Sequence, residues 1–312
     1  MSDALPSRAA IIATARESIA RGSKSFAAAS LLFDPPTRER AWLLYAWARA
    51  GDDIADGQEA GHGMRQVEDA PARVAALRTL TDAALTGQVV GEPAFDGLRI
   101  VAAETGLPPA WPHALIDGFV LDAEGWRPET EADLLRYCWH VAGVVGCMMA
   151  VVMGVAPDDH ATLDRAADLG MAFQLANVAR DIGEDAAAGR CYLPADWLAE
   201  EGIAPATVME PANRAALARL ARRLTTLAAG FEASARVGTA ALPFRSAWAV
   251  LAAAGIYGAI GREVARRGER AWDDRVSTSA VAKLGFIARA AGEAARRRSL
   301  PEMPRPSWQR PR

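Results

Sequence analysis

The chain has 312 residues, of which 51% are hydrophobic and 23% charged, and its formal net charge at pH 7 is -3. These values are typical of a folded globular protein and argue against a disordered chain or a generally basic protein that binds nucleic acid. About a fifth of the residues are alanine. Because alanine favours helix over strand, this composition excludes an all-β fold.

Hydrophobic residues recur with helical period along most of the chain, and proline and glycine mark the breaks. The first predicted helix covers residues 7–32, and the second is capped by Thr37 and runs to about Asp56. A polar loop is expected at 57–71. Further helices are predicted at 72–85, 94–105, 109–121, 129–155, 158–185, 211–236, 243–267 and 278–298, and the segment 195–206 is predicted to be short and broken. Since no alternating run predicts a strand, we expect one all-α domain over residues 1–298.

The end of the chain, residues 299–312, has a different composition, rich in arginine and proline, and contains Trp308. We expect this tail to be a solvated, disordered end. The alternative is weak attraction to anionic lipid headgroups, with Trp308 as an interfacial anchor.

The residues that could indicate a compartment or a metal site are few. The three cysteines, Cys138, Cys147 and Cys191, show no CxxC spacing, and the four histidines form no HxxxH pattern. Disulfides and zinc sites are therefore not expected. No signal peptide is apparent at the N-terminus, so we expect the cytosol. Uncharged stretches at 141–157 and 246–261 are too short to span a bilayer and predict buried helices. Contact with the inner face of the cell membrane stays open.

Two helices of the predicted set carry acidic residues at helical spacing. In the first, Tyr45, Arg49, Asp52 and Asp56 step by three or four residues and form one stripe on an otherwise apolar helix. Carboxylates four residues apart on one helix face repel each other, so the arrangement needs a reason. A solvated surface is the ordinary explanation, but the apolar neighbours disfavour it.

The second acidic stripe consists of Gln174, Asn177, Asp181 and Asp185, again on an apolar helix. If the two stripes face each other, their oxygens suit a hard divalent cation such as Mg²⁺, which also takes oxygens from a phosphate. Arg49 and Arg180 could hold the remaining phosphate charge. The residues thus predict Mg²⁺-assisted binding of a phosphorylated ligand beside an apolar cavity.

At this point the chain resembles a known family. DDIAD at Asp52–Asp56 and NVARDIGED at Asn177–Asp185 are similar to the paired aspartate-rich motifs of the squalene/phytoene synthase family. GSKSF, YCWHVAGVVG, GRCYLP and RGERAWDDRVSTS resemble further motifs of that family, in its order, between about Ser18 and Lys283. The last of these is most like bacterial members that make phytoene.

The resemblance implies the all-α isoprenoid synthase fold, a single helical domain around a central cavity. It implies an enzyme that joins two geranylgeranyl diphosphates head to head into 15-cis-phytoene through prephytoene diphosphate. Mg²⁺ is the implied cofactor, with Mn²⁺ as an alternative, and NADPH is not expected. The implied partners are a prenyl diphosphate substrate and a membrane surface that receives the product.

The resemblance also assigns roles to residues. The implied metal ligands, of which the aspartates are also the implied catalytic residues, are Asp52, Asp56, Asn177, Asp181 and Asp185. The implied contacts to the diphosphates or the first prenyl carbons are Ser23, Lys24, Ser25, Tyr45, Arg49, Gln174, Arg180 and Tyr257.

Two positions depart from the family pattern, and two alternatives to the main hypothesis remain. Trp139 stands where the family has Tyr and either shapes the cavity or packs in the core; Gly22 stands where some relatives have His. Gly143 and Gly146 either line the cavity or allow close helix contacts. The alternatives are a squalene or dehydrosqualene synthase acting on farnesyl diphosphate, and a non-catalytic relative that binds prenyl lipid or assists assembly.

Overall fold

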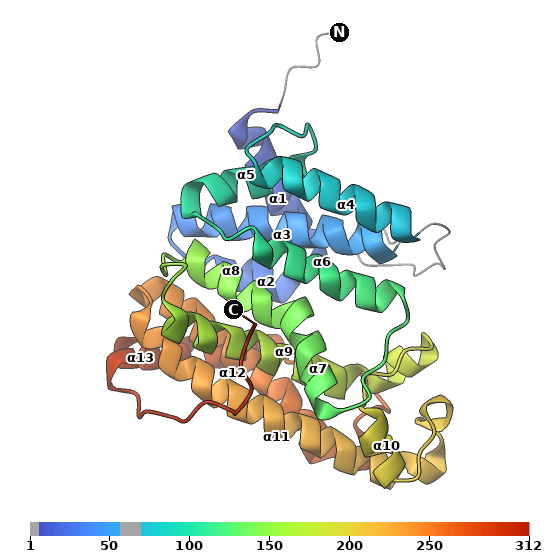
Figure 1. Ribbon diagram of the computed structural model, residues 1–312. Helices are drawn as coiled ribbons and strands as arrows, with labels where there is room; N and C mark the ends of the chain where they lie inside the picture. Colours follow the sequence, from blue (N-terminus) through green and yellow to red (C-terminus); the bar gives the residue numbers. More distant parts are fainter. Residues whose placement is uncertain (1–5, 57–69, 312) are drawn as a thin grey trace. The chain divides into compact units, whose positions relative to one another are not determined.

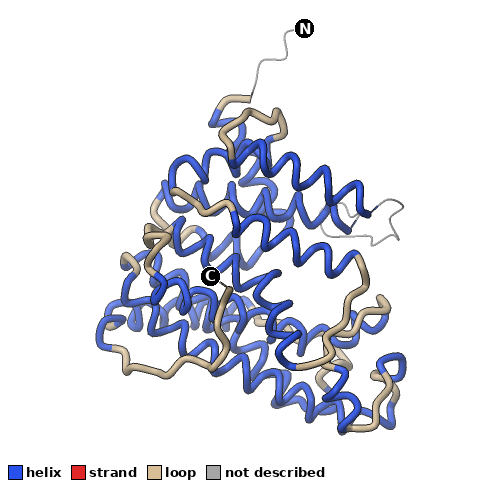
Figure 2. Tube along the Cα trace, viewed as in Figure 1, coloured by secondary structure: helices blue, strands red, loops and turns tan. Residues whose placement is uncertain are grey.

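The structure, a computed structural model, describes residues 6–56 and 70–311, with the side chains of Lys24, Ser25, Ala55, Asp56 and Ala70 outside the description. Every regular element in this part of the chain is a helix (Figure 2). The all-α prediction is therefore confirmed. The loop expected at 57–71 lies almost wholly outside the described residues.

The chain divides into two compact units, and each is described by itself. Unit 1 comprises Met1–Glu124 and Cys147–His160, and unit 2 comprises Gly125–Gly146 and Ala161–Arg312. The chain passes between them at three points, two of them inside helices. A single domain that ends at residue 298 stays a prediction.

Unit 1 is built around one long helix, α3, which carries the first acidic stripe. Its helices are α1 (Arg8–Gly22), α2 (Lys24–Ser30), α3 (Pro35–Asp56), α4 (Ala70–Leu85), α5 (Pro93–Thr105) and α6 (Ala110–Ala123), together with most of α8 (Val144–Val152). Helix α3 packs against α1, α2, α4, α5 and α6, as Figure 1 shows for its blue and teal neighbours. Its side chains Leu43 and Trp47 are fully buried, so its position is set by apolar burial.

The start of unit 1 differs from the prediction in two places. The single helix expected at 7–32 is broken at Ser23, whose backbone is extended, so that its hydroxyl oxygen accepts a hydrogen bond from Phe26 N and caps α2. Helix α3 is capped by Asp34 rather than Thr37, because Asp34 Oδ1 accepts from Thr37 N at 3.1 Å. Prolines fit the first turn that follows, since the amides they lack there have no partner within the helix.

Unit 2 holds the second acidic stripe, on its longest helix, α9. Its α-helices are α7 (Glu131–Cys138), α9 (His160–Ala187), α10 (Ala195–Glu200), α11 (Arg214–Gly238), α12 (Phe244–Arg267) and α13 (Ala280–Ala295). Helix α12 packs against α11 and α13. Short 3₁₀ turns lie at Pro205–Thr207, Pro211–Asn213, Thr239–Ala241, Gly268–Arg270 and Arg297–Ser299. The short, broken helix predicted at 195–206 is confirmed: α10 ends at Glu200 and a separate turn follows at Pro205–Thr207.

The helix predicted at 129–155 is continuous over Glu131–Val152. It begins with a reciprocal capping box between Thr130 and Asp133. Its middle, Trp139–Gly143, is a π-helical segment, η1, which the periodicity did not predict. Such π-helical segments are rare in proteins, and many of those that occur lie at functional sites.

Two helical stretches, Glu131–Val152 and Phe244–Arg270, are long and apolar enough to cross a membrane. In their most apolar windows, 61% and 56% of the residues are buried in the protein. Since core helices of folded domains pass the same test of length and composition, this feature agrees with the predicted buried helices and is weak support for a span.

Candidate active site

The first half of the candidate site lies on α3 in unit 1, where Tyr45, Arg49 and Asp52 form one half-buried stripe. Arg49 Nη1 donates to Asp52 Oδ2 at 2.6 Å and lies 3.7 Å from Asp53 Oδ1. Burial lowers the pKa of Arg49, but the interactions with Asp52, Tyr45 and Asp53 together outweigh burial and the pKa is raised. Arg49 therefore stays a cation beside the carboxylates.

Two polar atoms of this half are buried and have no hydrogen-bond partner among the described residues, the Tyr45 hydroxyl and Arg49 Nε. Buried polar atoms normally form hydrogen bonds, so these two atoms are candidates to bind a ligand. Tyr45 packs its ring against Phe26 of α2, with centroids 5.7 Å apart. The break at Ser23 thus places the GSKSF motif directly beside this stripe.

Gly22 explains why the approach is so close. A Cβ atom at Gly22 would lie 2.3 Å from the Tyr45 hydroxyl oxygen, far inside contact distance. The departure from the His of some relatives therefore has a structural consequence, since a side chain here would displace Tyr45. The predicted contacts Lys24 and Ser25, and the predicted metal ligand Asp56, have side chains outside the described residues.

The second half lies on α9 in unit 2. Gln174, Asn177, Arg180, Asp181 and Asp185 are all half-buried, on a helix whose intervening apolar residues are buried. The helix faces expected from the spacing are therefore confirmed.

Arg180 and Asp181 form an ion pair on this face. Arg180 Nε donates to Asp181 Oδ1 at 2.7 Å, and its Nη2 pairs with the second carboxylate oxygen. Burial lowers the pKa of Arg180, but the hydrogen bonds and attraction from Asp181 outweigh this effect and leave the pKa raised. The Asn177 Oδ1 atom is buried and has no hydrogen-bond partner among the described residues.

Tyr257 joins this half from α12. Its ring stacks on Phe173 of α9, with centroids 4.2 Å apart. The stack brings the predicted contact Tyr257 beside the face that carries Gln174 and Asn177, and it buries apolar surface next to the polar stripe.

Arg275 belongs to this half, and sequence reasoning missed it. Arg275 Nη2 lies 3.1 Å from Asp181 Oδ1, and Nη1 pairs with Glu184. Trp272, three residues earlier, donates its indole N–H to the Ala179 carbonyl oxygen at 3.0 Å and so fixes the segment on α9. Arg275 is part of the RGERAWDDRVSTS motif, but the motif alone does not show that this arginine contacts Asp181.

Tyr137 was also missed, although it begins the YCWHVAGVVG motif. Its ring lies between those of Trp126 and Tyr192, with centroids 5.6 and 4.9 Å away. Tyr192 belongs to GRCYLP, so the stack joins two of the recognised motifs. Their positions in the sequence did not indicate this contact.

The two open questions about small and large residues near the site now have answers. Trp139 is 3% exposed, so it packs in the core. A Cβ at Gly146 would lie 2.2 Å from the Ala166 carbonyl oxygen, so this glycine allows close helix contact. At Gly143 the nearest atoms to a Cβ are those of Trp139 and Met171, at 3.0 and 3.2 Å.

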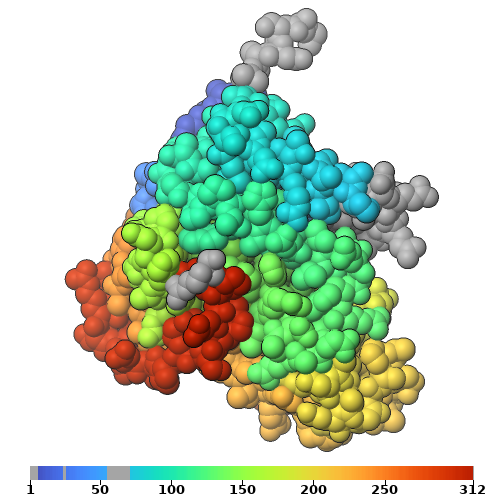
Figure 3. Space-filling view, in the orientation of Figure 1, coloured from blue at the N-terminus to red at the C-terminus, as the bar shows by residue number. Residues whose placement is uncertain are grey.

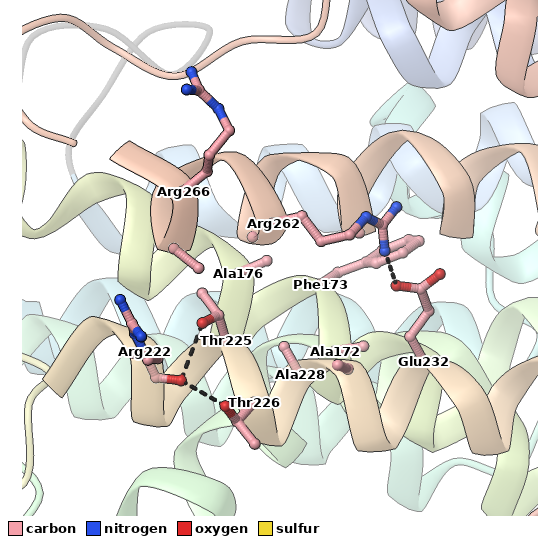
Figure 4. Close-up of a pocket in the computed structure, with 14 residues that line it drawn as sticks. Ala172, Phe173, Ala176, Arg222, Thr225, Thr226, Ala228, Glu232, Arg262 and Arg266 are labelled. Carbon is pink, nitrogen blue, oxygen red and sulfur yellow. Dashed lines mark hydrogen bonds and ion pairs between the residues drawn. The ribbon is translucent and has the colours of Figure 1, made fainter. Parts of the chain in front are cut away.

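A groove of about 440 Å³ lies between α9, α11 and α12 (Figure 4). Its walls include Ala172, Phe173 and Ala176, and arginines surround it. Arg262 pairs with Glu232 at 3.2 Å, which offsets part of the positive charge. None of the residues predicted for the site lines this groove.

The fit to a metal rests on the donors present. Asp52, Asp181 and the orphaned Asn177 Oδ1 are oxygen donors, the type that hard divalent cations take. Within residues 6–56 and 70–311, no three His, Cys, Asp or Glu side chains come together to hold a metal ion. Because the stripes belong to different units and the Asp56 side chain is not described, the metal assignment stays a prediction.

Comparison with known proteins gives a consistent result. A sequence model of the squalene/phytoene synthase family matches residues 19–282. The chain is 47% identical to the 15-cis-phytoene synthase of Pantoea ananas over 95% of this chain and 96% of that protein. It is 48% identical to the 15-cis-phytoene synthase of Enterobacter agglomerans, over 93% and 99% of the two chains.

Solved structures support the fold. A dehydrosqualene synthase in complex with a ligand superposes with a TM-score of 0.82 at 25% identity, over 91% of this chain and 96% of that one. A squalene synthase from Alicyclobacillus acidocaldarius gives a TM-score of 0.72 at 23% identity, over 83% and 94% of the chains. These likenesses confirm the predicted isoprenoid synthase fold.

Proposed function

Because this chain belongs to the squalene/phytoene synthase family, we propose that it joins two geranylgeranyl diphosphates head to head into 15-cis-phytoene through prephytoene diphosphate. The observation that carries this proposal is the 47–48% identity, over nearly the whole chain, to 15-cis-phytoene synthases. Further support comes from Asp52 on α3 and from Asp181 and Asp185 on α9, which are half-buried on their helices. The chain is therefore an enzyme of the prenyltransferase type, in carotenoid biosynthesis.

The reaction begins with heterolysis of an allylic C–O bond, and diphosphate leaves with the electron pair. Arg49 on α3, with Arg180 and Arg275 near Asp181, can hold the developing negative charge without proton transfer. The second prenyl double bond attacks the cation, and loss of a proton closes the cyclopropane. The cyclopropyl diphosphate then loses its own diphosphate, rearranges and loses a proton. No external hydride is required.

We further propose Mg²⁺ as the cofactor, with Mn²⁺ as the alternative. Asp52, Asp56, Asn177, Asp181 and Asp185 would hold it, and a divalent cation bound there would neutralise diphosphate oxygens. The support is the oxygen-only donor set and the orphaned Asn177 Oδ1 atom. Activity that survives exhaustive chelation would contradict this assignment.

Purified protein incubated with Mg²⁺ and either geranylgeranyl or farnesyl diphosphate tests the main proposal. We expect a forty-carbon hydrocarbon with the mass and ultraviolet spectrum of phytoene, together with released diphosphate. A thirty-carbon product alone would favour a squalene or dehydrosqualene synthase. No product from either substrate would favour a non-catalytic relative.

We also propose contact with the cytoplasmic face of an anionic membrane, because a forty-carbon hydrocarbon needs an apolar destination. The support is an exposed apolar face on α13, where Val281 is 79% and Leu284 is 67% exposed. Between residues 280 and 300, five cationic side chains accompany one acid, which suits anionic headgroups. The ring of Trp308, the alternative anchor considered for the tail, packs against Trp139 and Phe231, so we propose the α13 face in its place.

Vesicle flotation tests this contact, with phosphatidylcholine vesicles that contain or lack phosphatidylglycerol. The double variant Val281→Ser and Leu284→Ser should bind mixed vesicles about a hundredfold more weakly, from about 3 kcal/mol of lost apolar burial. Val89→Ser, at a 49% exposed position of unit 1, is the matched control. Equal binding by the double variant and the control would refute this surface.

A further inference from the structure

The end of the chain is ordered against unit 2, contrary to the solvated tail expected from its composition. Arg305 Nε and Nη2 each lie 2.9 Å from an oxygen of Asp168, and Nη1 lies 3.2 Å from Asp164 Oδ2. Arg310 Nε donates to Asp164 Oδ1 at 2.6 Å, with its side chain 3% exposed. Figure 3 shows the red C-terminal segment lying flush on the green surface of unit 2.

These contacts satisfy a carboxylate that has no access to water. Asp168 on α9 is fully buried and also accepts a hydrogen bond from the Ser234 hydroxyl of α11 at 2.5 Å. A buried carboxylate without a cation is costly, so Arg305 is its required counter-ion. Arg165 of α9 also donates hydrogen bonds to the carbonyl oxygens of Ser234 on α11 and Met303 in the tail. The tail thereby ties α9 to α11.

Trp308 joins the tail to the π-helical segment. Its ring lies 5.9 Å from that of Trp139 and 6.5 Å from that of Phe231, centroid to centroid. Trp139 is the first residue of η1. The tail therefore contacts three elements, η1, α9 and α11, through the half-buried side chains of Arg305 and Trp308.

The two elements η1 and α9 approach each other closely near the residues that the tail contacts. A Cβ at Gly170 would lie 2.1 Å from the Ala142 carbonyl oxygen, so the two backbones touch there. Asp168, which Arg305 holds, is two residues before Gly170. Trp139, which Trp308 covers, is one helical turn before Ala142. The tail thus contacts both η1 and α9 close to the point where their backbones meet.

We propose that Arg305 and Trp308 are positioning residues for the reaction, which fix the rotation and register of α9 against η1. The inference rests on the proposed function, because α9 carries Asn177 and Asp181. Helix α9 is continuous from His160 to Ala187, so a shift at Asp168 is transmitted to Asp181, about 20 Å further along the axis. Misplacement by about 1 Å can cost a hundredfold in rate.

Steady-state kinetics on full-length Trp308→Ala and Trp308→Phe, well below their unfolding temperatures, test the proposal. For Trp308→Ala we expect kcat to fall about tenfold, KM to change less than about twofold, and the cyclopropyl intermediate to accumulate relative to phytoene. Trp308→Phe keeps an aromatic contact and should restore kcat and product ratio. Arg305→Lys keeps the charge with fewer donors and should lie between them.

The matched control is Arg236→Met, which removes ion pairs with Glu232 and Glu293 of unit 2 without touching the tail. It should lower the melting temperature and leave kcat and product ratio unchanged. If Trp308→Ala behaves like this control, with lower stability and normal kcat per folded molecule, the tail is only structural and the proposal is overturned. If Trp308→Ala does not fold, Arg305→Lys decides in the same way: lower stability with normal kcat per folded molecule would overturn the proposal.

Hydrogen exchange supplies a measurement that does not depend on turnover. In Trp308→Ala the amides of residues 174–187 should exchange about tenfold faster than in the parent, and in Arg236→Met they should not. Unchanged exchange in both variants would overturn the positioning role, even in an active enzyme. Faster exchange in a protein that makes no phytoene would instead overturn the proposed function and leave the positioning of α9 standing.

Discussion

Arg275 Nη2 lies 3.1 Å from Asp181 Oδ1, although Arg275 comes from the connection after α12 and Asp181 from the last two turns of α9. This contact places a second cation beside a carboxylate that already pairs with Arg180. Arg275 also pairs with Glu184, so two guanidinium groups and two carboxylates meet here. The guanidinium groups suit the binding of a diphosphate at this point.

We therefore expect Arg275→Gln to lower kcat/KM by about tenfold to a hundredfold, which corresponds to about 1.4 to 2.7 kcal/mol of lost transition-state stabilisation. Initial rates over a range of prenyl diphosphate concentrations measure this. The control is Arg266→Gln, also a cation but 71% exposed and paired with Glu263. Equal rates for both variants would show that Arg275 has no role in substrate binding.

The aspartates of the two stripes give the next prediction. Asp52→Asn or Asp181→Asn should reduce turnover about a thousandfold or more while helical circular dichroism is retained, because each removes a charged oxygen donor from the proposed metal site. The control on α3 is Asp53→Asn, one residue off the stripe and 3.7 Å from Arg49. Near-normal turnover in either stripe variant would contradict the metal assignment.

Gly22 and Tyr45 allow a test that separates stability from activity. Gly22→Ala should lower the free energy of unfolding by about 1 to 3 kcal/mol, because the new Cβ meets the Tyr45 hydroxyl. In the double variant with Tyr45→Phe that atom is gone, and the next ring carbon is 3.3 Å away. Urea unfolding should then show recovered stability. Activity should stay low in the double variant if the hydroxyl contacts substrate, and its full recovery would exclude that contact.

Much of this architecture was accessible from sequence because it rests on local pattern. Alanine content and helical period predicted the all-α fold, and four-residue spacing predicted the faces that carry Asp52 and Asp181. The break at Ser23 was missed because its signal, a serine able to cap the next helix, lies inside a run with good helical period. The contact itself depends on Tyr45, which lies on another helix.

The larger errors involve contacts between residues far apart in the chain. The tail appeared solvated because composition was the only guide, and its arginines gave no hint of partners. Those partners, Asp164 and Asp168, stand on α9 as ordinary helical acids whose burial is visible only in the structure. Arg275 was missed for the same reason. Sequence pattern indicates which residues share an element, and only the fold shows which elements meet.

The glycines at the helix crossing give the last prediction, and it concerns stability alone. Gly170→Ala would place a Cβ 2.1 Å from the Ala142 carbonyl oxygen, with Gly143 Cα at 2.8 Å. Backbone atoms cannot move away independently as the end of a flexible side chain can. The new Cβ would therefore force η1 and α9 apart. We expect the free energy of unfolding to fall by about 3 kcal/mol, at the upper end of overpacking costs.

Gly292→Ala on α13 is the matched control, because nothing lies within 4 Å of its added Cβ. Alanine in an open helical position should raise the free energy of unfolding by about 0.5 to 1 kcal/mol. Both substitutions replace glycine by alanine. If the free energy of unfolding falls for Gly170→Ala and rises for Gly292→Ala, the difference is due to the close contact between η1 and α9. If Gly170→Ala is neutral, η1 and α9 do not meet as closely as described, and the positioning role assigned to Arg305 and Trp308 loses its structural basis.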